Sequence, residues 1–291
     1  MKIDGIKKIE RARKLVKNKG LLFKCPVCNQ SMFVNGMGSL SCDQNHSFDF
    51  SKQGYLNLLT AAGTPVYSKE LFAARHEVCL AGFYDPLVEM LVNIIHAHPG
   101  SKNILDAGCG EGSNIFNIYS QTRPYSNNFF VGADISKDSI QIAANNNADI
   151  IWCVADLAKL PFMNQTFDMV INILSPANYN EFQRILTDDG IIVKVVPGAE
   201  YLQELREMIY KDRETADYSN HEVIRNFGEK LNVVDIINTE YQFAVSDDLW
   251  PHLVKMTPLI WGSSTEKINQ ILNNKVPHIT VDLLLLIGTR R

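Results

Sequence analysis

Five short apolar segments, separated by polar segments of helix length, run through the middle of this 291-residue chain and limit the folds it can adopt. They lie at residues 103–108, 129–135, 150–156, 168–174 and 191–197. Each is a nearly continuous apolar run, which is typical of a strand covered on both faces, and strands that alternate with helices pair in parallel. Two further segments, 233–245 and 279–288, are predicted to be the last strands and to form a hairpin at one end of the sheet. The pattern predicts an α/β fold with a seven-stranded, Rossmann-like sheet.

A cysteine-rich segment precedes this sheet. Residues 21–60 show no helical periodicity and are too few and too polar to bury a core without a staple. Within them Cys25, Cys28, Cys42 and His46 form a C-x2-C-x13-C-x3-H motif, and Zn²⁺ prefers four tetrahedral thiolate and imidazole ligands. Free cysteines with a redox role are the alternative, but the third cysteine and the histidine favour zinc. Because four protein ligands leave no open coordination position, the metal of this small zinc-binding domain is predicted to be structural.

The composition is that of an ordinary globular protein, with 46% hydrophobic and 21% charged residues. The apolar run 281–287 is far too short to span a bilayer, and the charged N-terminus lacks the apolar core of a signal peptide. The other three cysteines, Cys79, Cys109 and Cys153, are scattered in a way that suits a reducing compartment. We therefore expect a cytoplasmic protein with no membrane partner.

Positive charge is concentrated at the N-terminus, although the net charge of the chain is −4. Residues 1–20 have a net charge of +6 and residues 21–60 balance, which leaves −10 for residues 61–291. A nucleic-acid enzyme usually shows a basic footprint, and this extension is the obvious one. The alternative is a solvated basic helix that has no partner. The candidate phosphate-binding side chains are Arg11, Arg13, Lys14, Lys17 and Lys24.

A glycine-rich, acidic loop follows the first strand of the sheet. It contains Asp106, Gly108, Gly110, Glu111 and Gly112, and glycines let the backbone approach a bound ligand closely. The last of these glycines comes one position too early for the G-x-G-x-x-G dinucleotide fingerprint, and the two carboxylates would repel a pyrophosphate. S-adenosylmethionine has no phosphate and carries two cationic groups. The loop therefore predicts an S-adenosylmethionine site that includes Asp106, Gly108, Gly110 and Glu111.

Two carboxylates lie at the ends of the next two strands. Asp134 closes the second strand, where an acidic residue binds the ribose hydroxyls, and Asp156 closes the third, where it could accept from the adenine amino group. Each alone could equally be a helix N-cap or a turn residue. With the glycine loop they predict a methyltransferase domain. The predicted division of the chain is a basic extension (1–20), the zinc-binding domain (21–60), a connector with helices (61–100) and the methyltransferase domain (101–291).

Several motifs, spread over nearly the whole chain, together resemble those of one known family. They are the zinc motif, KQGYLNLL (52–59), ELFAARHEVCLAGFYDPL (70–87), DAGCGEG (106–112), LPF (160–162) and MTPLIW (256–261). The glycine loop is generic to methyltransferases, whereas the zinc motif followed by QGYLNLL, with MTPLIW far downstream, is much more specific. In this combination the chain resembles the bacterial 23S rRNA (guanine-N(1))-methyltransferases of the RlmA type.

The resemblance implies a class I methyltransferase that uses S-adenosylmethionine and methylates ring nitrogen 1 of a guanine in a hairpin loop of 23S rRNA. It also implies a zinc domain that helps to grip the hairpin, a homodimer with a cleft for RNA, and an effect on the binding of macrolide-type antibiotics. Tyr84, Gly110 and Glu111 match cofactor-contacting positions of the family. Tyr201 falls where another cofactor contact is expected.

Two features depart from the family's pattern or refine it. The basic stretch before the zinc motif is longer than the family's. ILSPAN (173–178) lacks the Asn-Pro-Pro-aromatic signature of exocyclic-amine methyltransferases, which is consistent with attack by a ring nitrogen.

No residue identifies itself as the general base. Ring nitrogen 1 of guanine is protonated at neutral pH, so a carboxylate or an ordered water must take its proton. The target base must also be unpaired or flipped out, and Trp250 and Trp261 either offer it a stacking face or pack a helix onto the sheet. The candidate bases are Asp85, Asn172, Ser175 and Glu181.

Two other functions stay open from the sequence. A small-molecule methyltransferase with a merely structural zinc module suits the acidic body of the chain and would need an enclosed pocket. A non-catalytic RNA- or protein-binding factor on the same fold is disfavoured by the intact glycine loop, Asp134 and Asp156, which such a relic would be expected to lose in part.

Overall fold

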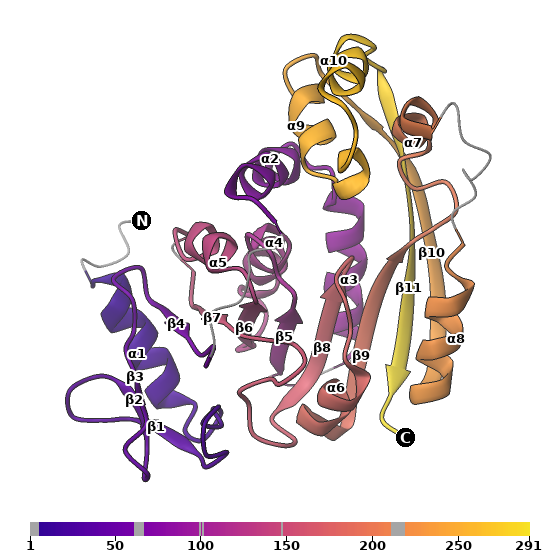
Figure 1. The fold of residues 1–291 in the computed structure, drawn as a ribbon. Coiled ribbons are helices and arrows are strands. Elements are labelled where there is room, and N and C mark those ends of the chain that lie inside the picture. The colour runs from indigo at the N-terminus through magenta and orange to yellow at the C-terminus, as the bar shows by residue number, and fades with distance from the viewer. Residues whose placement is uncertain (1–5, 61–66, 99, 101, 147, 211–218) are drawn as a thin grey trace.

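The structure, a computed structural model, describes residues 6–60, 67–98, 100, 102–146, 148–210 and 219–291, and an eight-stranded sheet forms its centre (Figure 1). The strand order is β10-β11-β9-β8-β5-β6-β7-β4. The strands from β4 to β9 pair in parallel, and β11 and β10 complete the sheet in antiparallel pairs. The sheet strands are β4 (Tyr55–Asn57), β5 (Asn103–Ala107), β6 (Phe129–Asp134), β7 (Ile150–Val154), β8 (Phe167–Ile173), β9 (Leu186–Pro197), β10 (Asn232–Ala244) and β11 (His278–Thr289).

The seven predicted strands and the terminal antiparallel pair are confirmed, and with them the α/β fold class. Most predicted bounds differ from the observed ones by one or two residues. The largest difference is at β9, which begins at Leu186 because this residue already pairs with Phe167 of β8. The eighth strand was not predicted. β4 is only three residues long, too short to show a period, and it pairs Leu56 with Cys153 at the edge of the sheet.

The predicted zinc segment therefore contributes to two sheets. A separate three-stranded sheet consists of β1 (Met32–Val34), β2 (Leu40–Cys42) and β3 (Ser47–Phe48). The following residues, in β4, extend the large sheet, and the backbone at Phe23 forms an isolated bridge with Phe162. These contacts join the zinc segment closely to the large sheet. The domain boundary at residue 60 stays a prediction.

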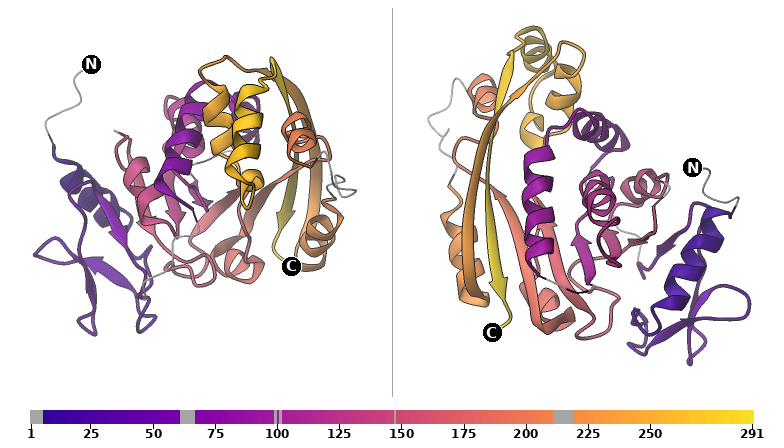
Figure 2. Two further views of the ribbon diagram at one scale, coloured as in Figure 1. Left: turned by 45° about the horizontal axis from the view of Figure 1, so that its top comes forward. Right: turned by 180° about the vertical axis from the view of Figure 1, so that it is seen from behind.

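Two groups of helices cover the large sheet, because successive strand residues alternate between two buried clusters (Figure 2). Ile104 belongs to the first cluster and Leu105 to the second. The first group is α2 (Lys69–Leu80), α3 (Asp85–Ala97), α4 (Ser113–Thr122), α5 (Lys137–Ala143), α7 (Gln203–Tyr210), α9 (Trp250–Lys255), the 3-10 helix η1 (Pro258–Ile260) and α10 (Thr265–Asn273). The second is α1 (Lys8–Asn18), α6 (Tyr179–Ile185) and α8 (His221–Lys230).

The basic N-terminal segment is one of these packed helices. Ala12 and Val16 of α1 are buried, so the helix packs on the rest of the chain and is not solvated on all sides. Whether it contacts RNA stays a prediction. Lys8 donates to the carbonyl oxygens of Ala144 and Asn145, at 3.1 and 2.7 Å. A narrow apolar stripe was hidden among the lysines, whose long stems cover the sheet while their charges reach polar groups.

Part of the predicted connector, residues 61–66, lies outside the described residues. Among the described residues no single helix is both long and apolar enough to cross a membrane. Only α2 and α3 taken together, bent by 76° at the break between them, reach that length and composition.

Candidate functional site

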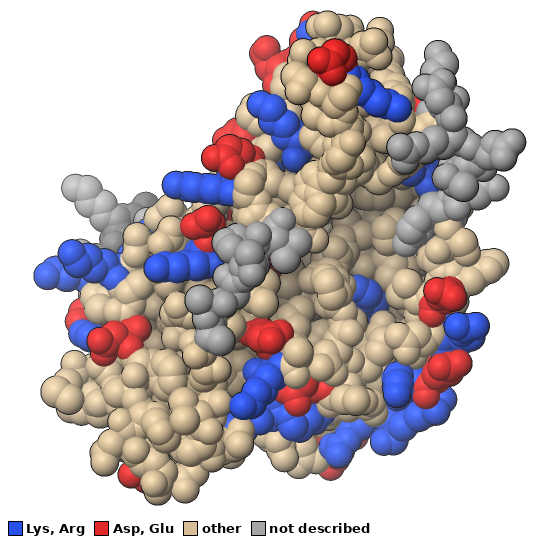
Figure 3. All heavy atoms as spheres, viewed as in Figure 1, with Lys and Arg blue, Asp and Glu red and all other residues tan. Residues whose placement is uncertain are grey.

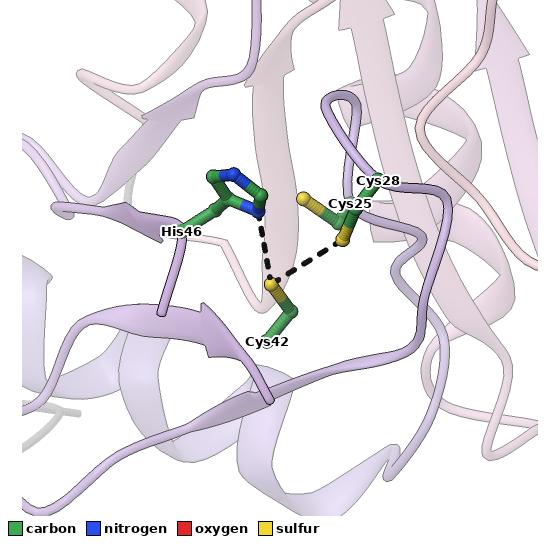
Figure 4. A group of neighbouring side chains, drawn as sticks. All are labelled: Cys25, Cys28, Cys42 and His46. Carbon is green, nitrogen blue, oxygen red and sulfur yellow. Dashed lines mark hydrogen bonds between the residues drawn. The ribbon is translucent and has the colours of Figure 1, made fainter. Parts of the chain in front are cut away.

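The four predicted metal ligands converge. Their ligand atoms all lie within 4.8 Å of one another, on the turn before β1 and on the β2–β3 hairpin (Figure 4). Cys42 Sγ is 3.6 Å from Cys28 Sγ and 3.4 Å from His46 Nδ1. A tetrahedral ion with bonds of about 2.3 Å to sulfur and about 2.0 Å to nitrogen needs ligand separations of this size. Cys25, Cys28, Cys42 and His46 therefore fit a structural Zn²⁺.

One thiol of this cluster is prepared for ionisation. Burial raises the pKa of Cys42, but hydrogen bonds from His46, Cys28 and Gln44 outweigh it and lower that pKa to about 7. The pKa of the Cys28 thiol is raised, by burial and by its hydrogen bonds with Cys42 and Cys25. Metal binding requires thiolates, so it must release protons from this cluster. The zinc segment also makes an apolar contact with the rest of the chain before its sheet begins, where the rings of Phe23 and Phe162 lie 5.5 Å apart.

A cavity of about 220 Å³ lies at the carboxyl ends of the parallel strands. This is the edge where open α/β sheets bind their ligands. Gly108 and Gly110 after β5, Asp134 at the end of β6, and residues 173–176 at the end of β8 and in the following turn form its floor and walls. The remaining lining residues come from helices and later turns: Tyr67, Leu71, Phe72, Arg75, Tyr84, Pro197, Tyr201, Met256, Thr257 and Pro258.

Gly108 is required by the close approach of two loops. It has φ +84, and a Cβ there would lie 2.0 Å from the Ser175 hydroxyl oxygen. Gly110, also at positive φ, has only Phe72, of the residues that the structure describes, within 4 Å of the position a Cβ would take. The first glycine thus fixes the loop against the wall of the cavity, and the second keeps the cavity open to a ligand.

Asp134 holds the glycine loop. Its two carboxylate oxygens accept hydrogen bonds from the backbone N–H groups of Gly110 and Ser136, at 2.9 and 2.8 Å. Burial raises the pKa of Asp134, and these two hydrogen bonds oppose that shift. The predicted strand-end carboxylate therefore lies in the cavity and also shapes it.

Two further carboxylates lie behind the loop, buried rather than lining the cavity. Burial raises the pKa of Asp106 to about 7, and its Oδ1 has no hydrogen-bond partner among the described residues. Glu111 lies 3.4 Å from Nε of Arg75, close enough for an ion pair although not aligned as a hydrogen bond. With Asp134, these groups make the loop acidic, and Arg75 balances only part of that charge. This donor set fits the sulfonium and ammonium groups of S-adenosylmethionine and disfavours a pyrophosphate.

The two predicted tyrosines meet. The hydroxyl oxygens of Tyr84, before α3, and Tyr201, after β9, lie 2.9 Å apart, and both residues line the cavity. Burial raises the pKa of both phenols, so each stays neutral and can donate or accept a hydrogen bond. The Arg75 guanidinium lies 5.7 Å from the centre of the Tyr84 ring.

Asp156 is not brought into this cavity. Its carboxylate is exposed and accepts from the backbone N–H of Ala158 at 2.8 Å, the turn role that was the alternative for this residue. It lines a second hollow of about 440 Å³ on the other side of the turn 174–178. A contact of Asp156 with adenine stays a prediction.

Of the four candidate bases, Ser175 alone lines the cavity among the described residues. Glu181 is held by Arg184 at 2.7 Å and by the backbone N–H of Leu160. The Asn172 amide donates to the carbonyl oxygens of Ala107 and Pro176.

The fourth candidate, Asp85, lies at the start of α3 and is exposed, with its carboxylate turned to Gly82. The structure thus separates Asp85 and Glu181 from the cavity.

The two tryptophans divide between the two roles. Trp250 is fully buried and donates from Nε1 to the Ile271 carbonyl oxygen at 3.0 Å, so it packs α9 onto the core. Trp261 is 50% exposed, and its ring lies 5.2 Å from that of Tyr67, which in turn lies 6.0 Å from Phe72. Tyr67 and Phe72 line the cavity, so these three rings form an aromatic rim at its mouth.

The candidate phosphate-binding side chains also divide. Arg11 lies 3.5 Å from Asp149, and Arg13 lies 2.7 Å from Glu10, so both are paired within the protein. Lys14 and Lys17 are exposed on α1. Lys24 lies at the seam between the zinc segment and the catalytic domain, within range of Arg184 and Lys159.

A buried lysine behind the cavity wall was missed. Lys194 of β9 is 6% exposed and donates to Asn172 Oδ1 at 2.6 Å and to the Ser175 carbonyl oxygen. It thereby anchors the turn that begins at Leu174, a non-glycine residue with φ +49. Burial lowers the pKa of Lys194 to about 8. A lysine inside IIVKVVP resembles a solvent-facing strand residue, so the sequence offered no signal for it.

Replacing Lys194 with methionine is expected to change how stability depends on pH. The pKa of Lys194 is about 8 in the folded chain against an ordinary 10.5, so between these values only the unfolded chain binds the proton and folded stability rises with pH. From pH 7.5 to 9.5 the free energy of unfolding should therefore rise by roughly 2 kcal/mol in the wild type, and the variant should lack this rise. Urea unfolding of both proteins at the two pH values measures the difference. If the free energy of unfolding changes equally with pH in both proteins, Lys194 is not a buried lysine with a lowered pKa.

Arg75, Tyr67 and Phe72 were also missed as site residues, whereas Trp261 was named from the sequence as a possible stacking face. Arg75 stands in ELFAARHEVCLAGFYDPL, but nothing in its spacing showed that α2 would bring it over the glycine loop. Tyr67 and Trp261 are far apart in the chain, so only the tertiary fold pairs them.

Comparisons with known proteins agree with this geometry. A family model described as "Methyltransferase domain" matches residues 99–272, and one described as "RlmA, N-terminal" matches residues 23–70. A Bacillus subtilis (strain 168) protein, provisionally named a 23S rRNA (guanine-N(1)-)-methyltransferase, is 37% identical over 275 residues, which cover 92% of this chain and 97% of that protein. A Streptomyces fradiae protein named 23S rRNA (guanine(748)-N(1))-methyltransferase is 25% identical over 261 residues, covering 87% and 90%.

A solved structure shares the fold. It is a methyltransferase of Anabaena variabilis ATCC 29413, provisionally assigned to an antibiotic biosynthesis pathway. It matches with a TM-score of 0.51 at 14% identity and covers 69% of this chain and 96% of that one.

Proposed function

Because this chain belongs to the RlmA-type family of S-adenosylmethionine-dependent methyltransferases with an N-terminal zinc-binding domain, we propose that it methylates ring nitrogen 1 of a guanine in a hairpin loop of 23S rRNA. The proposal rests on the presence of two features in one molecule. The first is an acidic glycine-loop cavity behind an aromatic rim. The second is a Cys3His cluster in the segment that packs on the large sheet through β4.

The cavity supports the cofactor half of the reaction. When bound, S-adenosylmethionine supplies an electrophilic methyl group on a sulfonium centre. Asp134 and the glycine loop position the ligand, and the paired Tyr84 and Tyr201 hydroxyls offer neutral hydrogen-bonding groups. Holding nucleophile and methyl carbon on one axis can supply roughly 7–11 kcal/mol of the barrier.

The aromatic rim supports the substrate half. A guanine attacked at ring nitrogen 1 must leave its base pair, and an unstacked base gains roughly 1–3 kcal/mol on an aromatic side chain. Trp261 is half exposed and continues through Tyr67 and Phe72 into the cavity. The rim therefore provides a stacking path from the surface to the methyl group.

Ser175 is the candidate that can pass the guanine proton outward. Its hydroxyl lies on the wall beside Gly108, although a serine hydroxyl is too weak a base to keep the proton. We propose that Ser175 orders a water that accepts it. The roles of Asp85, Asn172 and Glu181 as bases lose support, since their side chains lie outside the cavity or are already hydrogen-bonded.

The deciding experiment is methyl transfer from labelled S-adenosylmethionine to 23S rRNA hairpin transcripts, followed by mass spectrometry of the digested nucleosides. We expect labelled 1-methylguanosine, and none from a transcript whose target guanine is replaced by adenine. If zinc-loaded protein that binds the cofactor leaves every transcript unlabelled, the small-molecule methyltransferase becomes the better hypothesis.

We also propose that the protein acts in the cytoplasm as a homodimer, on the family resemblance and its free cysteines. Light scattering should then give twice the 32.8 kDa mass of one chain, and a monomer at micromolar concentration would contradict the dimer.

A further inference from the structure

A second hollow lies directly beside the reaction cavity. It measures about 440 Å³, within the ~300–1,000 Å³ range of ligand sites. Pro176 lines both hollows, so the turn 174–178 is the wall between them. The residues already described as catalytic do not extend into it.

The lining of this hollow is polar and rich in amides. Asn180 and Asn226 are exposed, while Asn178 closes one side by donating to the Ala158 carbonyl oxygen at 3.4 Å. The one carboxylate in the lining, Asp156, is engaged by the backbone N–H of Ala158. Amide side chains offer both donors and acceptors, the combination that reads the edges of an unpaired base.

One lysine lines the hollow and a second follows a lining residue in the chain. Lys230, at the end of α8, belongs to the lining, and Lys159 follows Ala158. Lys159 is exposed and donates to the carbonyl oxygen of Pro26 in the zinc segment at 3.1 Å. The backbone N–H of Lys24 donates to the carbonyl oxygen of Pro161 at 3.0 Å, so Lys24 lies beside the segment that carries Lys159.

The local carboxylates offset these positive charges only in part, since Asp156 in the lining faces more than one nearby lysine. Glu181 already holds Arg184 at 2.7 Å, and in the described part of the chain no salt bridge reaches Lys24, Lys159 or Lys230. Basic side chains gather along the lower middle of the face drawn in Figure 3, with acidic side chains interspersed among them. The repulsion between neighbouring positive charges is unfavourable, and a bound anion that contacts several of them would relieve it.

We propose that this second hollow binds the nucleotide next to the target guanine, with Lys24, Lys159 and Lys230 holding its flanking phosphates. The RNA strand then runs from the zinc module across the turn 174–178 into the reaction cavity. This inference rests on the proposed function, since it assumes an RNA substrate. It also explains why an acidic chain can act on RNA, because the footprint is a local cluster and not the N-terminal helix.

The test compares two pairs of lysines of equal charge. Lys159→Gln with Lys230→Gln removes two cations from the hollow, and Lys14→Gln with Lys17→Gln removes two exposed cations from α1. Lys24 is left intact because it adjoins the zinc ligand Cys25. Methylation of the hairpin transcript is measured at several salt concentrations, together with the cofactor Kd and the Tm.

The hollow pair should raise the KM for RNA about tenfold near 0.1 M salt and make the slope of log(kcat/KM) against log[salt] shallower by about 1–2, as expected for lost phosphate contacts. The cofactor Kd and the Tm should stay unchanged, and Lys159→Arg should retain the wild-type KM. The α1 pair should change the KM less than twofold.

Three results would overturn the site. They are an unchanged KM in the hollow pair, an equal rise in both pairs, which would mean net charge alone, and a larger rise in the α1 pair. If wild-type protein does not methylate RNA, the proposed function itself fails. That failure is distinct because it appears before any lysine is changed.

Discussion

Replacing Asp134 with asparagine is expected to weaken the binding of S-adenosylmethionine by roughly 10–100-fold, because a hydrogen bond to a charged group contributes about 1.5–3 kcal/mol. Each carboxylate oxygen of Asp134 accepts one backbone N–H, from Gly110 and from Ser136. Asparagine has one acceptor oxygen, so its amide group must face one of these N–H groups. The Gly110 end of the loop then loses its anchor at the position where the cavity must stay open.

Isothermal titration of zinc-loaded protein measures this change. Asp156→Asn is the matched control, because its oxygen can still accept from Ala158 and its side chain lies outside the cavity. We expect the control to keep the cofactor Kd within about twofold. If the two variants bind the cofactor equally well, Asp134 does not hold the glycine loop in the way the hydrogen bonds indicate. If Asp156→Asn alone binds weakly, the adenine contact predicted from the sequence is the correct role for Asp156.

The fold was largely predictable because burial on both faces leaves a clear mark in the sequence. Strands such as 150–154 are apolar throughout, and the glycines of the loop after 107 have no other reason to cluster. The zinc ligands were predictable for a similar reason, since a fixed spacing of scarce residue types reflects coordination geometry. In both cases the structural requirement acts on residues that are close together in the sequence, so a short segment is enough to detect it.

The site residues that were missed depend on contacts between distant segments. Arg75 reaches the cavity only because α2 crosses over the glycine loop, and Lys194 is buried only because the turn after β8 folds back on it. β4 is too short to carry a period. Asp156 shows the converse limit, since a strand-end carboxylate is also a good turn residue and the sequence holds no means of choosing.

Replacing Cys42 with serine should have the largest effect on the whole molecule. The serine hydroxyl is a poor zinc ligand, and structural zinc contributes about 10–16 kcal/mol to the folding of small zinc domains. The three short strands of the zinc sheet bury little else than Met32, Leu40 and the cluster itself. Loss of the zinc ion should separate Phe23 from Phe162 and weaken the packing of α1 and β4, which lie before and after the zinc sheet in the chain. We expect zinc content to fall below about one fifth of an equivalent and the Tm to fall by roughly 10 °C or more, at about 2–4 °C per kcal/mol.

The same variant separates the two halves of the protein. No residue that lines the reaction cavity lies within residues 21–60, so binding of S-adenosylmethionine should survive below the new Tm with a Kd within about threefold of wild type. Methylation of the hairpin should fall at least 100-fold, because the proposed RNA path begins on the zinc module and Lys159 is bonded to it through Pro26. Cys153→Ala, a buried cysteine of β7 outside the cluster, is the control and should keep its zinc. Full methylation by zinc-free protein would show that the module stabilises nothing the reaction needs, and the RNA would then have to approach the aromatic rim from the side of α9 and α10 instead.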